Sequence, residues 1–432
     1  MAARKSINIG LMGLGVIGGG VVKVLMDRPD TLAREAGSKL VLKKVLEKDT
    51  SKHGALGIDR ALFTTRFEDL VKDPEIDVIV ELMGSEHPAF EYMKEALSNG
   101  KHVVTANKEV MSKHWAELLT AARESNTVIR YEASVGGGIP LISPFQEDLV
   151  ANDVTAIYAI VNGTTNYILT RMAKEGMDFS VALKDAQKLG YAEANPTNDI
   201  EGIDAAYKLA ILSTIAFGTE VKPDNVYHEG ISRLKARDFK YARELGYAIK
   251  LLAIAKRVDN SIEARVHPVF IPEESLLAKV DGVYNAILVE GDLVGQVIFY
   301  GQGAGPSATS SAVVSDIIKI AQDINHGKPS SPRLPFAPER KVMPMDRINT
   351  RYYMRMSVAD RPGVLAQISK ILGDNAISIA SVIQKETDAS TKIAEIVIMT
   401  HTAEEQAVQK AIKETTDLGV VKEISNFVRV ET

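Results

Sequence analysis

Three ionisable residues in one short stretch have the types and spacing that acid–base chemistry needs. Glu193 lies in a predicted loop, and Asp204 and Lys208 lie four residues apart in the apolar-periodic run that follows. Residues four apart stack on one face of a helix. Such a pair is either a solvated ion pair worth about 0.3–0.5 kcal/mol or, in a partly buried cleft, a device that orients a hydroxyl or water and delivers a proton.

The surroundings of the pair favour the chemical interpretation. Asp199 and Glu201 crowd the start of the predicted helix, and the segment LAILSTIAF that follows is too apolar for a freely solvated helix. Pro196 restricts the residue before it, and Asn198 or Asp199 then offers an N-cap. We therefore predict a loop that leads into a helix over about residues 199–217.

The stretch GYAEANPTNDIEGIDAAYKLAIL, residues 190–212, resembles the signature of homoserine dehydrogenases. The match spans more than twenty residues with defined gaps. The resemblance implies that Lys208 is the acid/base and that Asp204 and Glu193 hold the amino-acid substrate. We also assign Asp199 to the substrate site.

The chain begins with a predicted apolar strand over residues 7–12, which leads into the turn GLGVIGGG and a helix that starts near Val21. This order suits a dinucleotide pyrophosphate, because the glycines allow a tight turn, close backbone approach and helix packing, and the helix N-terminus attracts the phosphates. The alternative is a tight turn without a ligand. The predicted cofactor contacts here are Gly13, Leu14, Gly15, Val16, Ile17 and Gly18.

The end of the second predicted strand, residues 40–46, bears on the choice of cofactor. Glu47 follows the strand directly, and Lys48 and Lys52 come after it. An acidic residue there binds the ribose hydroxyls of NAD, whereas a basic one favours the extra phosphate of NADP. The family it resembles often has a basic residue at the position of Lys48, so we expect NADP and leave NAD open.

Two later strands, DVIVEL and HVVTA, end at positions where parallel sheets place ligands. One interpretation of Lys108, just past HVVTA, is a solvated surface lysine. The resemblance of TANK to the family implies instead a second active-site lysine that steadies the substrate and the forming oxyanion. The remaining predicted cofactor contacts are Met83, Gly84, Lys108, Gly190 and Gly303.

The segment YEASVGGGIP, residues 131–140, contains three consecutive glycines and so offers backbone carbonyl oxygens. The resemblance implies a monovalent cation, Na⁺ or K⁺, held by an all-oxygen set of the kind that hard cations prefer. A tight crossover turn between domains is the alternative. The implied ligands are Glu132 and the backbone oxygens of Val135, Gly137 and Ile139.

The central region reads as a mixed sheet covered on one face, followed by a glycine loop, GQGAG, and a helix that returns to the first domain. We predict that a helix beginning near residue 164 is capped by Thr164 or Thr165. The predicted strands are 154–161, 262–271, 283–290 and 293–300, and the predicted helices are 164–175, 179–189, 199–217, 238–257 and 306–323.

The C-terminal region follows a proline-rich segment that prevents helix formation. Its predicted order is βαββαβ, and the runs DRPGVLAQIS and DNAISIASVIQ resemble the ACT domain, an amino-acid sensor. The resemblance implies threonine as effector, bound near a dimer edge, whereas a ferredoxin-like domain used only for dimerisation is the alternative. The implied effector contacts are Asp360, Gly363, Val364 and Leu365.

The predicted fold class is α/β with three domains. These are an N-terminal Rossmann dinucleotide-binding domain, an α+β substrate and dimerisation domain, and a C-terminal ferredoxin-like ACT domain. The predicted ranges are 1–140 with about 303–324 for the first domain, 141–302 for the second, 325–350 for the linker and 351–432 for the third.

Composition limits the partners of the chain. Its 432 residues carry a net charge of only −5 with no long basic run, which gives no reason to expect nucleic acid. The absence of cysteine and the scattered histidines argue against a transition-metal site. The short start MAARKS and the lack of an apolar run of about 18 residues argue against a signal peptide or membrane span. We expect a cytoplasmic homodimer or homotetramer.

The resemblance, which covers nearly the whole chain, implies a homoserine dehydrogenase that reduces L-aspartate 4-semialdehyde to L-homoserine with NAD(P)H, in threonine, methionine and isoleucine biosynthesis. Since the glycine turn starts at residue 13, we expect no aspartate kinase domain before it. The alternatives are another NAD(P)-dependent amino-acid or semialdehyde dehydrogenase and a catalytically silent amino-acid sensor. A silent protein would not need Asp204, Lys208, Glu193 and Lys108 together.

Overall fold

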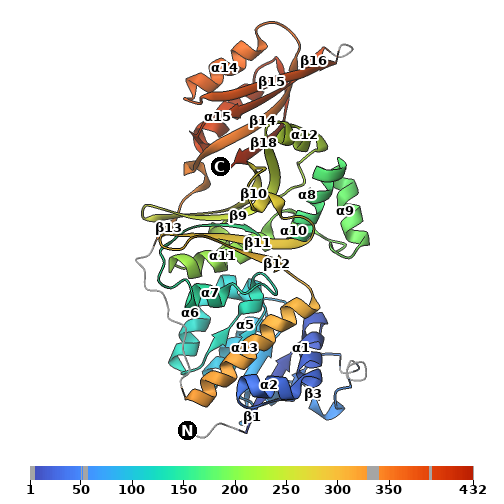
Figure 1. The fold of residues 1–432 in the computed structure, drawn as a ribbon, viewed down its shortest axis with the longest axis vertical. Coiled ribbons are helices and arrows are strands. Elements are labelled where there is room, and N and C mark those ends of the chain that lie inside the picture. The colour runs from blue at the N-terminus through green and yellow to red at the C-terminus, as the bar shows by residue number, and fades with distance from the viewer. Residues whose placement is uncertain (1–4, 50, 52–56, 328–339, 389–391, 432) are drawn as a thin grey trace. The chain divides into compact units, whose positions relative to one another are not determined.

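The computed structural model describes residues 5–49, 51, 57–327, 340–388 and 392–431 (Figure 1). The chain divides into two compact units. The first comprises residues 1–155, 207–225 and 289–340, and the second comprises residues 156–206, 226–288 and 341–432. Among the described residues, no helix combines the length and the apolar character needed to cross a membrane.

A parallel sheet with the order β3-β2-β1-β4-β5-β6 forms the centre of the first unit. Ile9, Leu11 and Val80 are fully buried, as in a parallel sheet covered on both faces. This strand order is that of the doubly wound dinucleotide-binding fold, so the Rossmann prediction is confirmed. The strands are β1 Ser6–Met12, β2 Lys39–Leu46, β3 Phe63–Thr64, β4 Val78–Glu81, β5 His102–Thr105 and β6 Ile129–Arg130.

Helix α13 returns to this unit and packs on α1, so closely that a Cβ on Gly20 would lie 2.4 Å from the Ser310 hydroxyl oxygen (Figure 1). α1 begins at Val16, five residues earlier than expected from Val21, because Gly18 and its neighbours are themselves helical. The elements that complete the unit are α1 Val16–Asp27, α2 Pro29–Ala36, α4 Glu68–Val71, α5 Ala89–Ser98, α6 Lys108–Glu124, α7 Ile142–Glu147, β12 Gly295–Gln302 and α13 Pro306–His326.

A mixed sheet runs through the second unit in the order β11-β7-β9-β10-β18-β14-β16-β15. β18 is parallel to β10 and antiparallel to β14, so one strand joins the C-terminal domain to the rest of the unit. The strands are β7 Val154–Ile160, β8 Tyr227–His228, β9 Tyr247–Val258, β10 Ser261–Pro272, β11 Tyr284–Gly291, β13 Lys341–Val342, β14 Asn349–Ala359, β15 Ile379–Asp388, β16 Ile393–Thr400, β17 Ala403–Glu404 and β18 Val421–Val430.

The predicted helix over residues 238–257 is wrong. α12 covers only Ala236–Glu244, and Gly246, with a φ of 79°, turns the chain into β9, which pairs with β10 along its whole length. β9 is buried from Ile249 to Ala255. A continuous apolar run lacks the alternation of a half-exposed strand, so periodicity alone cannot distinguish it from a buried helix.

Two details of the helices also differ from the prediction. Asn162 caps α8, because its Oδ1 accepts from the Thr165 N–H at 2.9 Å, so Thr164 and Thr165 lie inside the helix. The helix predicted over 199–217 is interrupted at Gly202, whose φ is 79°. The helices are α8 Gly163–Glu175, α9 Phe179–Lys188, α10 Thr197–Ile200 and α11 Ile203–Phe217.

Apart from the two-residue strand β17 before α15, the C-terminal domain has the order β14-α14-β15-β16-α15-β18, which confirms the predicted βαββαβ pattern. α14 spans Val364–Asp374 and α15 spans Glu405–Thr416. Both helices pack on one face of the strands around Tyr352, Ile368 and Val408. Gly363 is the N-cap of α14, and Pro362 directly precedes it.

Candidate active site

The glycine turn between β1 and α1 has the geometry that a dinucleotide pyrophosphate needs. Gly13 has a φ of 91°, and a Cβ on it would lie 2.7 Å from the Leu82 carbonyl oxygen. A Cβ on Gly18 would lie 2.1 Å from the Gly13 carbonyl oxygen, whereas no described atom would lie within 4 Å of one on Gly15. The open side of the turn is therefore at Gly15, the N-cap of α1, where the helix N-terminus favours an anion.

The other predicted cofactor contacts of this turn differ in their exposure to solvent. Leu14 is buried, Val16 is 71% exposed and Ile17 is half-buried. Leu14 therefore anchors the turn through its side chain, while Val16 leaves the first turn of α1 accessible.

Glu47, at the end of β2, supports the glycine turn. Its Oε2 accepts from the Leu14 N–H at 2.8 Å, and its Oε1 accepts from the Asp49 N–H at 3.1 Å. Lys48 is exposed beside it. Lys52, the other basic residue predicted near the cofactor, lies outside the described residues.

A buried polar cluster fixes the ends of β4 and β5. Glu81 is fully buried and accepts from the Thr105 hydroxyl at 2.6 Å and from the Met83 N–H at 2.7 Å. Burial raises the pKa of the Glu81 carboxyl. Asn107 donates to the Ser85 carbonyl oxygen at 2.8 Å. The cluster thus holds the loop with Met83 and the exposed Gly84, both predicted cofactor contacts.

Sequence reasoning missed Glu81, Thr105 and Asn107 as supporting residues. The available signal is a carboxylate at the end of the otherwise apolar strand DVIVE, together with polar residues one strand later in TANK. A charge at such a position is buried and must find hydrogen-bond partners.

Both predicted active-site lysines belong to the first unit. Lys108 is the first residue of α6, directly after its N-cap Asn107, and is half-buried. α11 begins in the second unit and enters the first at Tyr207, so Lys208 lies there too, also half-buried. The Lys113 ammonium of α6 lies 5.6 Å from the Tyr207 ring centroid, which places α6 beside this part of α11.

The predicted cation loop lies against the loop that contains Gly303. A Cβ on Gly137 would lie 2.5 Å from the Gly303 carbonyl oxygen, and Val135 and Ile139 are buried. Gly303 is buried here as well. The glycines are therefore needed for close packing of two backbone segments.

The Glu132 carboxylate caps the start of α7. It accepts three backbone hydrogen bonds, at 2.5 to 2.9 Å, from Leu141, Ile142 and Ser143. Within the described ranges, no group of three or more His, Cys, Asp or Glu residues is placed to hold a metal ion. A cation in this loop would therefore be held mainly by backbone oxygens.

In the second unit, Asn162 joins two predicted substrate residues. Its Nδ2 donates to Asp199 Oδ1 at 2.7 Å and to Asp204 Oδ2 at 2.9 Å. Asp204 is only 4% exposed, and Asp199 is half-buried. Glu193 and Gly190 lie on the preceding loop and are exposed. Sequence reasoning missed Asn162, although its place directly after a predicted strand was a signal.

Comparison with known proteins identifies the family. The model of the homoserine dehydrogenase family matches residues 140–318, that of the homoserine dehydrogenase NAD-binding domain matches residues 13–132, and that of the ACT domain matches residues 352–420. A homoserine dehydrogenase of Neisseria gonorrhoeae is 43% identical over 433 residues, which cover 99% of each chain. The chain belongs to the homoserine dehydrogenase family.

Solved structures agree with this assignment. A homoserine dehydrogenase from Thiobacillus denitrificans has a TM-score of 0.94 at 43% identity and covers 100% of this chain and 99% of its own. A hyperthermophilic archaeal homoserine dehydrogenase in complex with NADPH has a TM-score of 0.63 at 27% identity and covers 73% of this chain and 97% of its own. The predicted NAD(P)-dependent oxidoreductase with a nicotinamide cofactor is confirmed.

The ACT domain of this homoserine dehydrogenase contains a cavity of about 470 Å³ at the start of α14. The four residues predicted to bind an effector line it, along with Gln384 of β15. Gly363 has a φ of 86°, and no described atom would lie within 4 Å of a Cβ there. The predicted effector residues, which the structure brings together here, are Asp360, Gly363, Val364 and Leu365.

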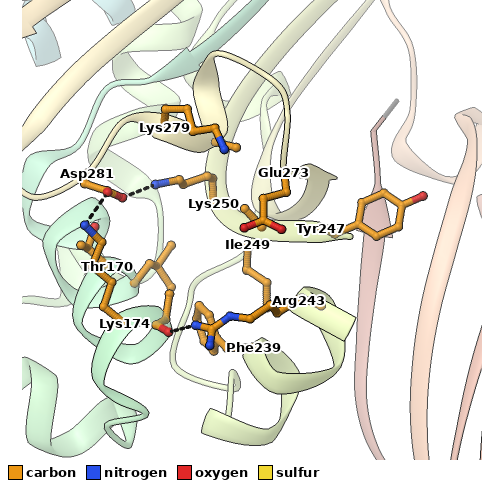
Figure 2. A pocket seen from close by; sticks show the side chains of 15 residues that line it. Thr170, Lys174, Phe239, Arg243, Tyr247, Ile249, Lys250, Glu273, Lys279 and Asp281 are labelled. Carbon is orange, nitrogen blue, oxygen red and sulfur yellow. Dashed lines mark hydrogen bonds and ion pairs between the residues drawn. The ribbon is translucent and has the colours of Figure 1, made fainter. Parts of the chain in front are cut away.

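Another cavity, of about 250 Å³, lies among α8, α12 and β9 in the second unit (Figure 2). Lys250, which is 4% exposed, binds the Val280 carbonyl oxygen and lies 3.3 Å from Asp281 Oδ1. Burial lowers the pKa of Lys250. Lys174 lies 2.7 Å from the other Asp281 oxygen. Asp281 therefore binds Lys174 of α8 and Lys250 of β9 at the same time, and these ion pairs hold α8 to β9.

Proposed function

We propose that Lys208 donates the proton when this enzyme reduces L-aspartate 4-semialdehyde to L-homoserine. The bound nicotinamide cofactor supplies the hydride, and the carbonyl oxygen that becomes the hydroxyl needs a proton. A half-buried ammonium can deliver it. The observation that carries the proposal is that Asp204, one helical turn before Lys208 in α11, is buried and bound to Asn162.

The neighbouring charged residues would then bind the substrate. Glu193 and Asp199 would bind its ammonium group, and Lys108 would steady the substrate and the charge that forms on its oxygen. Asn162 would keep Asp199 and Asp204 in place, because it donates to both.

The test is Lys208→Ala in the full chain. We expect kcat to fall by about 10²-fold or more, the usual scale of general acid–base catalysis, while NADPH binding stays unchanged. Lys222→Ala, which removes an exposed lysine, is the matched control and should keep normal turnover. Near-normal turnover in Lys208→Ala would remove the proposed role.

We propose NADPH as the preferred cofactor. Both Glu47 oxygens already accept backbone N–H groups, and Lys48 is exposed beside them, which favours an extra phosphate over ribose hydroxyls. Lys48→Ser should reduce the ratio of kcat/KM for NADPH to that for NADH, whereas Lys39→Ser, at the other end of β2, should not. A wild-type preference for NADH would contradict the proposal.

Three finer assignments belong to the same proposal. A Na⁺ or K⁺ ion would be held at Glu132, Val135, Gly137 and Ile139, and activity measured with tetramethylammonium as the only monovalent cation tests it. Threonine would bind the ACT cavity. The enzyme would be a cytoplasmic homodimer or homotetramer. Light scattering of the purified protein distinguishes the dimer from the tetramer, and fractionation of the cells tests the location.

A further inference from the structure

Arg429 of β18 connects the ACT domain to a segment of the substrate-binding region. It is 2% exposed. Its Nε and Nη2 bind the Glu405 carboxylate, within the ACT domain, at 2.9 and 2.6 Å. Its Nη1 donates to Glu229 Oε2 at 2.8 Å, and the Tyr227 hydroxyl donates to the same oxygen at 3.1 Å. One guanidinium therefore bridges the two parts.

Glu431, the residue after β18, fixes this strand to β10. Glu431 accepts from Arg265 at 2.6 Å and from Lys256 at 2.6 Å. Arg265 is 1% exposed and also lies 2.9 Å from Nε2 of the fully buried His267. Removing one partner of such buried charges leaves the other uncompensated, which is strongly unfavourable. When β18 shifts slightly, its buried ion pairs therefore stay intact, and the neighbouring strands move with it.

The segment with Glu229, residues 227–232, lies directly against the turn between α10 and α11. The Ile231 N–H donates to the Ile200 carbonyl oxygen at 2.9 Å. A Cβ on Gly230 would lie 2.4 Å from that oxygen, and one on Gly202 would lie 3.4 Å from the Glu229 carbonyl oxygen. With so little space between the two backbones, a displacement of the segment must displace the turn.

Asp199 and Asp204 lie on either side of this turn, and both are bound by Asn162. We propose that Glu229 is a positioning residue, whose bond to Arg429 holds the 227–232 segment, and through it the two aspartates, in the geometry that binds substrate. The ACT domain acts on substrate binding through this contact. An effector that binds two positions of β18 unequally shifts the turn. The inference rests on the proposed substrate role of Asp199 and Asp204.

Full-length Glu229→Ala and Glu229→Gln test the proposal. Glu395→Gln is the control, because Glu395 is a carboxylate that also bonds across the domain boundary, but from the ACT side and to Tyr241 of α12, at 2.8 Å. Glu395 is buried, whereas Glu229 is half-buried. The first measurement is hydrogen–deuterium exchange of residues 197–206. We expect about fivefold faster exchange in Glu229→Ala, a smaller increase in Glu229→Gln and none in the control.

The second measurement is steady-state oxidation of homoserine with NADP⁺. The KM for homoserine should rise about fivefold in Glu229→Ala, with kcat and the KM for NADP⁺ unchanged. Unchanged exchange at 197–206 would overturn the proposal, and Glu229→Gln gives the same comparison if the alanine variant does not fold. Faster exchange with an unchanged KM would uphold the contact and overturn the substrate role of the aspartates.

Discussion

Asp316 in α13 is a buried carboxyl whose ionisation opposes folding. It is 2% exposed, and burial raises its pKa to about 7, although the Glu132 backbone N–H donates to it at 2.8 Å. In the unfolded chain the pKa is about 4. Between these values the folded protein holds a proton that the unfolded chain has lost, so stability falls as pH rises from about 4 to 7.

Asp316→Asn should therefore stabilise the enzyme relative to wild type more at pH 8 than at pH 4.5. The amide keeps an acceptor for the Glu132 N–H and carries no charge, and the gain at pH 8 is on the order of 4 kcal/mol at most. Melting temperatures of wild type and variant at both pH values measure it. Asp323→Asn on the same helix, which loses an ion pair with Arg130 at 3.0 Å, should show no such gain. An equal difference at both pH values would contradict the prediction.

At the scale of single residues, the sequence predicts which charged residues matter more readily than it predicts their hydrogen-bond partners. The pair Asp204 and Lys208 is visible because the two residues are four apart. Asn162 is 37 and 42 residues from the aspartates it binds, and only the fold brings it to them. The predicted catalytic, substrate and cation roles themselves remain predictions until the variants are measured.

Among the elements, the glycine turn allows two roles of glycine to be separated. Gly18 is needed by the protein itself, since a Cβ there would lie 2.1 Å from a carbonyl oxygen. A Cβ on Gly15 would have no described atom within 4 Å, and Gly15 has a negative φ, so a methyl group there disturbs only what approaches from outside.

Gly15→Ala should therefore keep a near-normal melting temperature and bind NADPH about tenfold more weakly or worse, because the methyl group occupies the approach of the phosphates. Gly18→Ala should lower the melting temperature instead. Thermal melts and NADPH fluorescence titrations of the two variants test the distinction. Normal NADPH affinity in Gly15→Ala would mean that the phosphates approach elsewhere.

Elements marked by local signals were predictable. β1, β4 and β5 were predicted from short apolar runs and glycine turns. The βαββαβ order of the C-terminal domain was predicted from the apolar pattern of the segments between turns. β9 was missed because Ile249 to Ala255 is buried throughout and gives no alternation. The break at Gly202 was missed because a single glycine is tolerated in many helices. Here Gly202 has a positive φ and lies close to residues 228–229 and 266, which are distant in sequence.

At the scale of the second unit, the ACT domain shares a sheet with β10 and its neighbouring strands. A proline-rich segment before a small domain predicts a tethered sensor, yet β18 pairs with β10, and Glu431 binds Arg265 across that pairing. Sequence could not show this, because the partners are 166 residues apart. Removal of the domain and removal of its effector site should therefore have different consequences.

Gly363→Asp should abolish inhibition by millimolar threonine and leave activity without threonine intact. The side chain would fill the cavity, its Cβ meets no described atom, and aspartate tolerates a positive φ better than most residues. Gly373→Asp, which adds the same charge elsewhere on α14 with equal space, is the control and should stay inhibited. Steady-state rates against threonine concentration measure both. Inhibition that survives Gly363→Asp would place the effector outside this cavity.

A chain that ends at Gly327 should behave differently from Gly363→Asp. It lacks β18, so the edge of β10 is exposed at Val269 and Phe270. The buried Arg265 loses Glu431 at 2.6 Å and keeps only the longer contact with Glu263 at 3.3 Å, which is unfavourable for a buried charge. We expect the melting temperature to fall by about 5 °C or more, with most activity lost. Melting curves and steady-state rates of the truncated and intact enzymes test this. A truncated enzyme that is stable, fully active and insensitive to threonine would show that β10 does not need β18, and that the ACT domain acts as a detachable sensor.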